Sequence, residues 1–320
     1  LAMGLLGDAG NLPLRLAGEE PDAETGDNTH RVLVVDQSVQ SFEFEGVMER
    51  PVPSLLRGFS APVRLDYDYS RADLCALLSR DADGFVRWDA AQALATQVIQ
   101  EVEQQLADSG RAELDSLLSE AFGSLLADES LDPAMVADML ALPSENYLAE
   151  LASQSGGADV DGIHAARRLV QAALAADHGE VLLQRYRALS STAAYQPSGE
   201  QIAGRSLRNC CLDFLAAAGS AGTALALEQF EQANNITDRL AALRALALYG
   251  DAGSRDAALQ RFHGAWRHEA LVVNQWLQVQ AIIPDEDAVE RVRELLQHAD
   301  FELSNPNKVR SLIGAFANQN

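Results

Sequence analysis

The spacing of apolar residues changes near position 70, from a period of two to a helical period. Residues 39–45 and 63–69 alternate apolar or aromatic side chains with polar ones, which is typical of antiparallel strands with one buried face. After Ser70, apolar residues recur three and four positions apart. The chain is therefore expected to be mainly α-helical with a small all-β domain, divided into residues 1–69 and 70–320.

The β-region contains further strand and turn signals. Residues 1–6 and 12–17 flank a turn-forming sequence at 7–11, which predicts a hairpin, and residues 32–35 form a short apolar run. The acidic stretch 18–29 is expected to be a loop. Five strands joined by turns predict a small β-sandwich, either complete or lacking one strand at an edge.

The helical region opens with a start signal, because Ser70 followed by Asp73 resembles a capping box with a shorter acid. Helices are then expected at 71–80, 85–107, 111–127, 132–140, 144–153, 160–175, 178–190, 199–216, 221–232, 236–249, 254–266, 269–281, 285–297 and 305–317. Weakly similar segments recur along these helices, which favours helix pairs stacked as an α-superhelix. A compact irregular helical domain is the alternative.

Charge and composition limit the partners of the chain. Its 24 lysines and arginines against 47 acidic residues give a formal net charge of −23, with a sequence pI near 4.5. Nucleic acids and anionic membrane surfaces both require clustered cations, so neither is expected as a partner. No apolar stretch reaches the roughly 18 to 20 residues that a membrane-spanning helix needs.

The cysteines and the first residues bear on where the chain occurs. The chain has three cysteines, an odd number, and two of them are adjacent (Cys75, Cys210 and Cys211), so no disulfide framework is expected. This favours a reducing, cytoplasmic compartment. Leu1 begins an apolar run without a preceding basic segment, which does not resemble a signal peptide. We expect the chain to be a piece of a longer polypeptide.

Metal-ligand spacing is missing where it would be easiest to detect. His268 and Glu269 begin an H-E-x-x sequence, but Val272 stands where the second histidine is required. The other histidines show no spacing of four positions. Residues 81–84 resemble the middle of a calcium-binding loop, but Ala90 stands where the bidentate glutamate belongs, so a turn between helices is expected.

The sequence also contains no self-contained catalytic motif. Neither a G-x-S-x-G pattern nor a phosphate-binding glycine-rich loop occurs. Cys210 and Cys211 lie in an apolar helical run, where cysteine usually acts as a small buried hydrophobe. We therefore expect no catalytic and no metal-ligating residue in this chain.

Four sequence blocks, at 51–63, 87–92, 233–238 and 304–316, together resemble the bacterial aminopeptidase N (alanyl aminopeptidase) family of zinc exopeptidases. The blocks follow the order of that family along the whole chain. The resemblance implies an Ig-like β-domain followed by the first part of a C-terminal α-superhelix. It also implies that the zinc-binding catalytic domain lies upstream of Leu1 in the parent enzyme.

The resemblance further implies a role for this part of the enzyme. In the family the superhelix packs over the catalytic domain and closes the site into a cavity that short peptides enter. The chain is thus expected to be non-catalytic, to hold no cofactor while the parent enzyme holds zinc, and to limit substrate access during removal of N-terminal residues. The implied partners are the catalytic domain of the same polypeptide and the peptide substrates of the parent enzyme.

Two individual motifs are affected by the resemblance. Arg310 matches a family arginine on the cavity-facing side of the superhelix, and a salt bridge on the helix surface is the alternative. Residues 46–50 match the amine-binding G-x-M-E-N element of some aminopeptidases only in part, because the final asparagine is missing.

Two other functions stay open. The first is a free-standing helical-repeat scaffold that binds protein partners on a concave face. The second is an intact enzyme with unfamiliar chemistry, which is less favoured because no constellation of histidine, cysteine or carboxylate residues is visible in the sequence.

Overall fold

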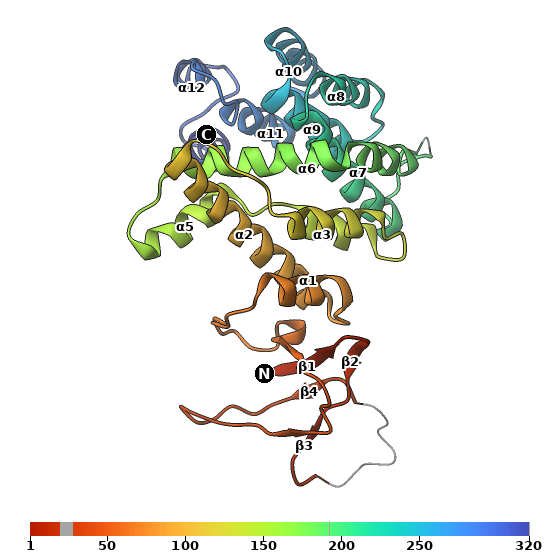
Figure 1. The fold of residues 1–320 in the computed structure, drawn as a ribbon. Coiled ribbons are helices and arrows are strands. Elements are labelled where there is room, and N and C mark those ends of the chain that lie inside the picture. Colours follow the sequence, from red (N-terminus) through yellow and green to blue (C-terminus); the bar gives the residue numbers. More distant parts are fainter. Residues whose placement is uncertain (20–27, 192, 320) are drawn as a thin grey trace.

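The computed structural model describes residues 1–19, 28–191 and 193–319, and it consists of a small β-region next to a larger helical region (Figure 1). The acidic loop expected at 18–29 falls largely outside the described residues. The β-region contains β1 (Ala2–Gly7), β2 (Gly10–Leu12), β3 (Arg15–Leu16), β4 (Arg31–Val32), β5 (Phe44–Glu45), β6 (Val52–Leu55) and the 3₁₀ turn η1 (Arg57–Phe59).

The helical region follows with short links between its elements. These are α1 (Arg71–Arg80), α2 (Gly84–Ser109), α3 (Ser116–Ala127), α4 (Pro133–Leu140), α5 (Glu145–Ser155), α6 (Val160–Ala188), α7 (Gly199–Ala217), α8 (Ser220–Gln232), α9 (Ile236–Tyr249), α10 (Ala252–Trp266), α11 (Ala270–Ala281), α12 (Ala288–Leu296), α13 (Pro306–Val309), the π-helical turn η2 (Arg310–Gly314) and α14 (Ala315–Gln319). No helix formed by the described residues combines the length and the apolar content needed to cross a bilayer.

β1 is the central strand of the β-region. It pairs antiparallel with β6 across one edge and with β2 and β4 across the other, while β3 and β5 form a second sheet. Met3 and Leu5 of β1 pack with Leu14 and Leu33 in a small core that the two sheets share. Leu6 joins the core of the helical region instead, because successive residues of a strand point to opposite faces.

The strand predictions for the first part of the chain are confirmed only in part. The hairpin around 7–11 is confirmed, since Gly7 of β1 lies opposite Gly10 of β2. Of residues 39–45, only the last two lie in a strand, and of residues 32–35 only the first does. The β-region therefore has two small sheets with short ladders of backbone hydrogen bonds.

The strand expected at 63–69 is wrong. The Val63 amide donates to the carbonyl of Ala61, and the Tyr69 amide donates to that of Tyr67, so this backbone forms local hydrogen bonds. The Tyr69 hydroxyl donates to the carbonyl of Pro53 at 2.6 Å and thereby ties the segment to β6. β6 itself was not expected, and it tolerates Pro53 because β1 is its one partner among the described strands.

Side-chain caps begin most of the helices. The Ser70 side chain accepts from the Asp73 amide, and the Asp73 side chain accepts from the Ser70 amide, so the expected capping box is confirmed. The turn expected at 81–84 is also confirmed, because α1 ends at Arg80 and Asp83 caps α2. Further side-chain caps are Asp115, Asp132, Ser144, Asp159, Ser198, Asn235, Asp251 and Asn305.

Several helix boundaries differ from expectation. The helix expected at 111–127 begins at Ser116, and the one expected at 285–297 begins at Ala288. The helices expected at 160–175 and 178–190 form one helix, α6, which departs from helical geometry inside at His178 (φ −117°, ψ 15°). The His178 ring lies 3.0 Å from the Ser119 hydroxyl of α3 and beside the ring of Phe122, which holds it at the bend. The helix expected at 305–317 is divided into α13, η2 and α14, because its middle turn is a π-helix.

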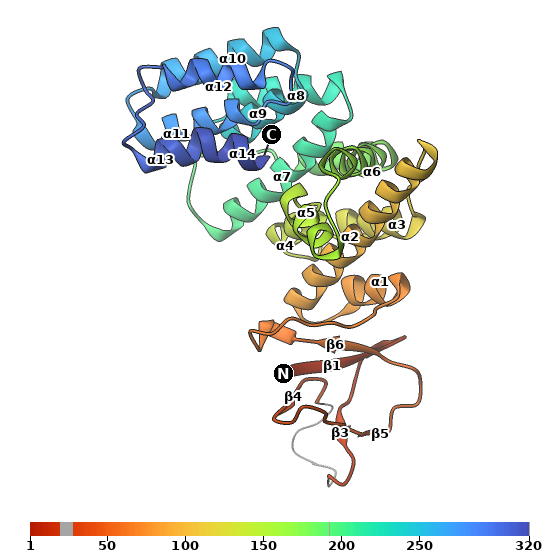
Figure 2. The same cartoon turned by 90° about the vertical axis from the view of Figure 1, so that its left-hand side faces the viewer.

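The helices follow one another in space roughly in sequence order, from α1 beside the β-region to α10 and α12 at the far end (Figure 2). Neighbours such as α1 and α2, α6 and α7, and α8 and α9 pack against each other. Their apolar faces form one continuous core that extends from Leu74 to Ala315. A mainly α-helical chain with a small β-domain, as expected, is therefore confirmed.

A buried ion pair joins the two regions. The guanidinium of Arg57 in η1 lies 3.2 Å from a carboxylate oxygen of Asp81, and each residue is 3% exposed. Arg57 also donates to the Ser54 hydroxyl at 2.7 Å, to the Thr29 carbonyl at 2.8 Å and to the Asn11 side chain. One arginine thus connects three segments of the β-region to the end of α1.

Candidate functional site

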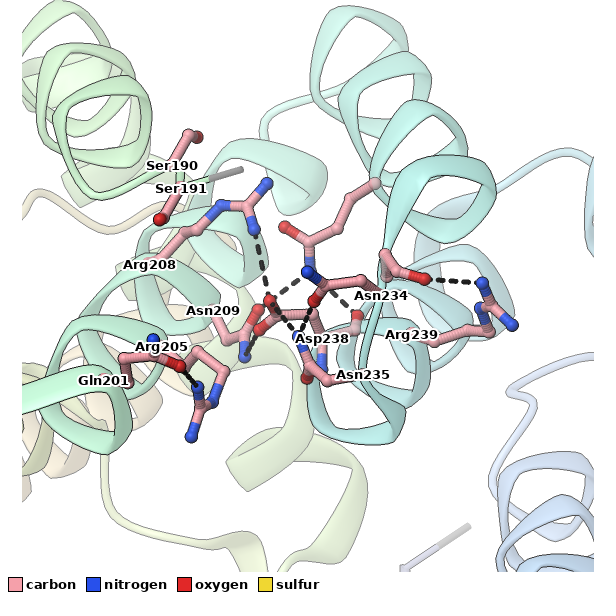
Figure 3. A network of polar contacts seen from close by, with 12 residues as sticks. Ser190, Ser191, Gln201, Arg205, Arg208, Asn209, Asn234, Asn235, Asp238 and Arg239 are labelled. Atoms are coloured by element: carbon pink, nitrogen blue, oxygen red, sulfur yellow. Dashed lines mark hydrogen bonds and ion pairs between the residues drawn. The ribbon is translucent and has the colours of Figure 1, made fainter. Parts of the chain in front are cut away.

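A polar network lies where α7 and α9 meet, around the buried Asp238 (Figure 3). Asn235 caps α9, so its side-chain oxygen accepts from the Asp238 amide at 2.9 Å and its nitrogen donates to Asp238 Oδ2 at 3.0 Å. From α7, Asn209 donates to Asp238 Oδ1 at 3.0 Å and Arg208 donates to Oδ2 at 3.3 Å. Both carboxylate oxygens are therefore occupied by donors from two helices.

Gln229 of α8 extends the network to α6. Its side-chain nitrogen donates to Asn209 at 2.8 Å and to the Asp238 carbonyl at 2.9 Å, and its oxygen accepts from the Tyr186 hydroxyl at 3.1 Å. The Arg208 guanidinium lies over the Tyr186 ring, 4.9 Å from its centroid. Burial raises the pKa of the Tyr186 hydroxyl, which stays a proton donor. The network joins four helices and compensates the buried charge of Asp238.

A cavity of about 650 Å³ opens beside this network. Its lining residues are Tyr186, Arg187, Ser190, Ser191, Arg208, Leu225, Glu228, Gln229, Gln232, Ala233, Asn234 and Asp238. Ser190 and Ser191 lie on the side of Arg208 away from Asp238 (Figure 3). The lining combines the guanidinium groups of Arg187 and Arg208 with the carboxylates of Glu228 and Asp238, so it can hold a polar group through hydrogen bonds. The lining includes neither a cysteine nor a histidine, so it supplies no nucleophile paired with an imidazole base.

Arg310 lies outside this cavity. It is the first residue of η2 and its side chain is exposed. No carboxylate of the described residues forms an ion pair with it, so the salt-bridge alternative has no partner within the described part of the chain. Its contact with a substrate cavity of the parent enzyme stays a prediction.

Residues of the rejected motifs have structural roles. Glu49, in the partial match at 46–50, accepts a hydrogen bond from the Asp8 amide at 3.1 Å. His268 lies 3.9 Å from the adjacent Glu269 on an exposed surface, and Val272 follows inside α11. These side chains do not converge on a metal or substrate.

The adjacent cysteines of α7 are poor nucleophiles. Burial raises the pKa of the Cys211 thiol to about 12, and it also raises the pKa of Cys210. A thiol reacts through its thiolate, so both groups stay protonated and unreactive near neutral pH. The expectation that they act as small buried hydrophobes fits this environment.

One group of potential ligands was missed in the sequence. His263 of α10 lies near His298 and Asp300, which follow α12, and one ligand atom from each falls within 4.8 Å of the others. Within residues 1–19, 28–191 and 193–319, it is the one group of three potential metal ligands that lie close together. A search for histidines four positions apart could not find it, because the fold brings two distant segments together.

Family models match two ranges of the chain. Residues 6–68 match a domain of unknown function (DUF3458) described as having an Ig-like fold. Residues 71–320 match a domain of unknown function (DUF3458_C) described as ARM repeats. An Ig-like fold followed by helical repeats agrees with the expected fold class.

Curated relatives carry the name aminopeptidase N. The protein of Escherichia coli is 40% identical over 94% of this chain, and those of Haemophilus influenzae and Caulobacter vibrioides are each 37% identical over 90%. The chain spans about a third of the length of these relatives, namely 34%, 33% and 33%.

A solved structure shows the same arrangement. The crystal structure of Legionella pneumophila aminopeptidase A in complex with aspartic acid matches 99% of this chain and 36% of its own, with 30% identity and a TM-score of 0.83. The similarity therefore extends over both regions of the chain.

Proposed function

Because this chain belongs to the aminopeptidase N family, we propose that it is the non-catalytic Ig-like and helical part of a zinc aminopeptidase that releases N-terminal residues from peptides. In this proposal the chain covers the catalytic domain of the same polypeptide and limits which peptides reach the catalytic zinc. One observation carries the proposal: 90% or more of this chain is similar to about one third of the length of each of three proteins named aminopeptidase N.

The residues of this chain do not fit the catalytic zinc that the family implies. His268 has Glu269 as its carboxylate neighbour and Val272 one turn further on, so the helical pair of histidines is missing. We assign the zinc and its chemistry to the remainder of the longer polypeptide. No catalytic step is derived for the side chains of this chain.

Exposed apolar side chains in the β-region support a contact with further polypeptide. Val34, Val39 and Met48 are 71%, 83% and 94% exposed. Exposed apolar groups of this kind are typical of interaction surfaces when they gather in one part of a molecule. We assign these three side chains to a contact with the catalytic domain, and we place the boundary between the two domains of this chain at residues 69 and 70.

A cytoplasmic location is part of the proposal. Cys75, Cys210 and Cys211, which are all described, are free thiols rather than disulfides. Free thiols are common in reducing compartments and uncommon in secreted proteins. This supports the assignment to the cytoplasm.

Arg310 is the residue that we assign to substrate access. An exposed guanidinium without a carboxylate partner in the described chain is free to bind the C-terminal carboxylate of a peptide. In the longer enzyme, Arg310→Ala should raise KM for tripeptides roughly fivefold, the effect of losing about 1 kcal/mol from an exposed ionic contact. The kcat for an amino-acid anilide, which has no carboxylate, and the melting temperature should stay unchanged.

Arg293→Ala is the matched control, because Arg293 is also exposed and pairs with Glu290 on the same helix at 3.2 Å. It should change neither KM nor kcat. Unchanged peptide kinetics together with a lower melting temperature in Arg310→Ala would instead support a structural salt bridge.

The reading frame around the chain tests the proposal as a whole. An in-frame H-E-x-x-H sequence with a later glutamate and a G-x-M-E-N element upstream of Leu1 would support the aminopeptidase. A start codon directly before Leu1 would favour the free-standing helical scaffold.

A further inference from the structure

The side chains of His263, His298 and Asp300 meet near the far end of the helical region. His263 Nε2 lies 2.6 Å from Asp300 Oδ2, and His298 Nδ1 lies 3.7 Å from the same oxygen. The three side chains are 21%, 34% and 31% exposed. They are therefore accessible to an ion from solvent while remaining partly enclosed by the protein.

The geometry points to a binding site for one Zn²⁺ ion at His263, His298 and Asp300. Two imidazole nitrogens and one carboxylate oxygen form a ligand set that suits zinc and disfavours calcium or magnesium. Ligand atoms around tetrahedral zinc are about 3.3 Å apart, given bonds of about 2.0 Å. The separations of 2.6 Å and 3.7 Å lie on either side of this value, and all three ligand atoms fall within 4.8 Å of one another, so side-chain rotations must adjust their spacing when zinc binds.

The surrounding residues restrict the orientation of the ligands. The centroid of the Trp276 ring lies 4.3 Å from that of the His263 ring and 5.2 Å from that of the His298 ring. The Trp276 indole is itself fixed by its hydrogen bond to the Leu259 carbonyl at 3.1 Å. Because the Trp276 ring packs against both imidazoles, the two histidine side chains are already restricted, and zinc binding costs less conformational entropy.

Three interactions must be accommodated when zinc binds. The hydrogen bond between His263 Nε2 and Asp300 Oδ2 at 2.6 Å is lost, because both atoms become ligands. His298 Nδ1 accepts from the Asp300 amide at 3.1 Å, and this hydrogen bond is replaced if that nitrogen becomes a ligand. Lys308 donates to the backbone carbonyl of Asp300 and not to its carboxylate, but the positive charge of Lys308 lowers the affinity for a cation. We therefore expect binding weaker than in zinc sites with four protein ligands.

A fourth coordination position is available beside the cluster. A cavity of about 390 Å³ adjoins it and is lined by both histidines, Trp276 and, among others, Gln280 and Asp256. Water can occupy this space and complete the coordination of the ion. Bound zinc would connect α10 with the segment that follows α12, so it would stabilise this end of the helical region.

The zinc site is independent of the proposed function and differs from the catalytic zinc of an aminopeptidase. It also departs from our expectation of no metal ligand in this chain, which rested on histidine spacing within single helices. The structure supplies ligands from two segments instead.

Zinc chloride titrated calorimetrically into the EDTA-dialysed 320-residue chain at pH 7.5 tests the proposal. We expect one zinc per chain, and at least a tenfold loss of affinity in His263→Ala and in His298→Ala. Binding should also weaken at pH 5.5, because zinc competes with protons for the imidazoles. Millimolar calcium should not compete.

His164→Ala is the matched control, because His164 forms a similar pair with Glu145 at 3.0 Å but meets no third potential ligand within the described part of the chain. It should bind zinc as the wild type does. A Co²⁺ absorption spectrum of a four-coordinate site, lost in His263→Gln, would give a second readout if an alanine variant fails to fold. Absence of binding, or binding that both His263 variants retain, would show only a hydrogen-bonded cluster and overturn the proposal.

Discussion

The β-region and the helical region of this chain are stabilised in different ways. In the helical region, caps begin most helices and one apolar core connects α1 with α14. The β-region has a core of four buried hydrophobic residues, strands of two to six residues and exposed valines. Its sheet is anchored to the helices through Arg57 and Leu6.

This difference indicates that the helical region can be stable by itself, whereas the β-region depends on its neighbours. Sheets with few strands and a small core are only marginally stable in water. All three tryptophans, Trp88, Trp266 and Trp276, belong to the helical region, so their fluorescence reports mainly on that region. Trp88 packs on Phe85, which contacts Phe59 of η1, and it therefore also senses the junction. Proteolysis within residues 1–69 reports on the β-region, and the two measurements together test the comparison.

Of these substitutions, Arg57→Ala is expected to have the largest effect, and it should destabilise the β-region much more than the helical region. The substitution leaves Asp81 buried without its cation, which costs about 3–5 kcal/mol for a pair of this kind. Cleavage within residues 1–69 should accelerate strongly in mild urea, while the midpoint of tryptophan fluorescence shifts little. Arg15→Ala, whose pair with Glu45 is more than 40% exposed on both sides, should cost less than about 1 kcal/mol.

Equal losses of stability by both probes in Arg57→Ala would contradict the comparison. The two regions would then unfold as one cooperative unit.

Asp238→Ala is expected to have an intermediate effect and to act on the helical region alone. It removes the acceptor of Arg208, Asn209 and Asn235, which should lower the free energy of unfolding by roughly 2–3 kcal/mol. Urea denaturation followed by tryptophan fluorescence measures the loss. Glu290→Ala removes an exposed pair within α12 and should cost no more than about 0.5 kcal/mol. A faster cleavage of the β-region in Asp238→Ala would refute the separation of the two regions.

Ser70→Ala should have the smallest effect, at the junction itself. Loss of the Ser70 hydroxyl leaves the Asp73 amide without its acceptor and should cost about 1 kcal/mol. The loss should be visible in the melting temperature followed by circular dichroism. Ser153→Ala is the control, because that hydroxyl donates only to the Ala149 carbonyl within α5, and a change near zero is expected. If the two substitutions lowered the melting temperature equally, the capping box would not contribute to the stability of the junction.

Local sequence signals predicted the helical region better than the β-region. The Ser70 and Asp73 pair was recognisable because a helix cap depends on residues three positions apart. The alternation at 63–69 predicted a strand, but alternation cannot supply a partner strand, and this backbone bonds to itself. β6 was missed although it pairs with β1, because a run that contains Pro53 does not resemble a strand.

The candidate sites were predictable only as separate pieces. The block at 233–238 was recognised by resemblance, but its role in holding Asp238 against Arg208 depends on the packing of α7 against α9. His263 and His298 are adjacent only because α10 and the segment after α12 fold together. No spacing rule within one helix describes such a contact.

The central position of β1 has a consequence for how the protein is made. Leu6 lies opposite Val52, so β1 leaves the ribosome well before its partner strand has been synthesised. Contacts between distant residues also form more slowly than those within a helix, because closing a long loop costs entropy. Until β6 arrives, the apolar strand Ala2–Gly7 is an open edge on the nascent chain, to which a strand of another molecule can add.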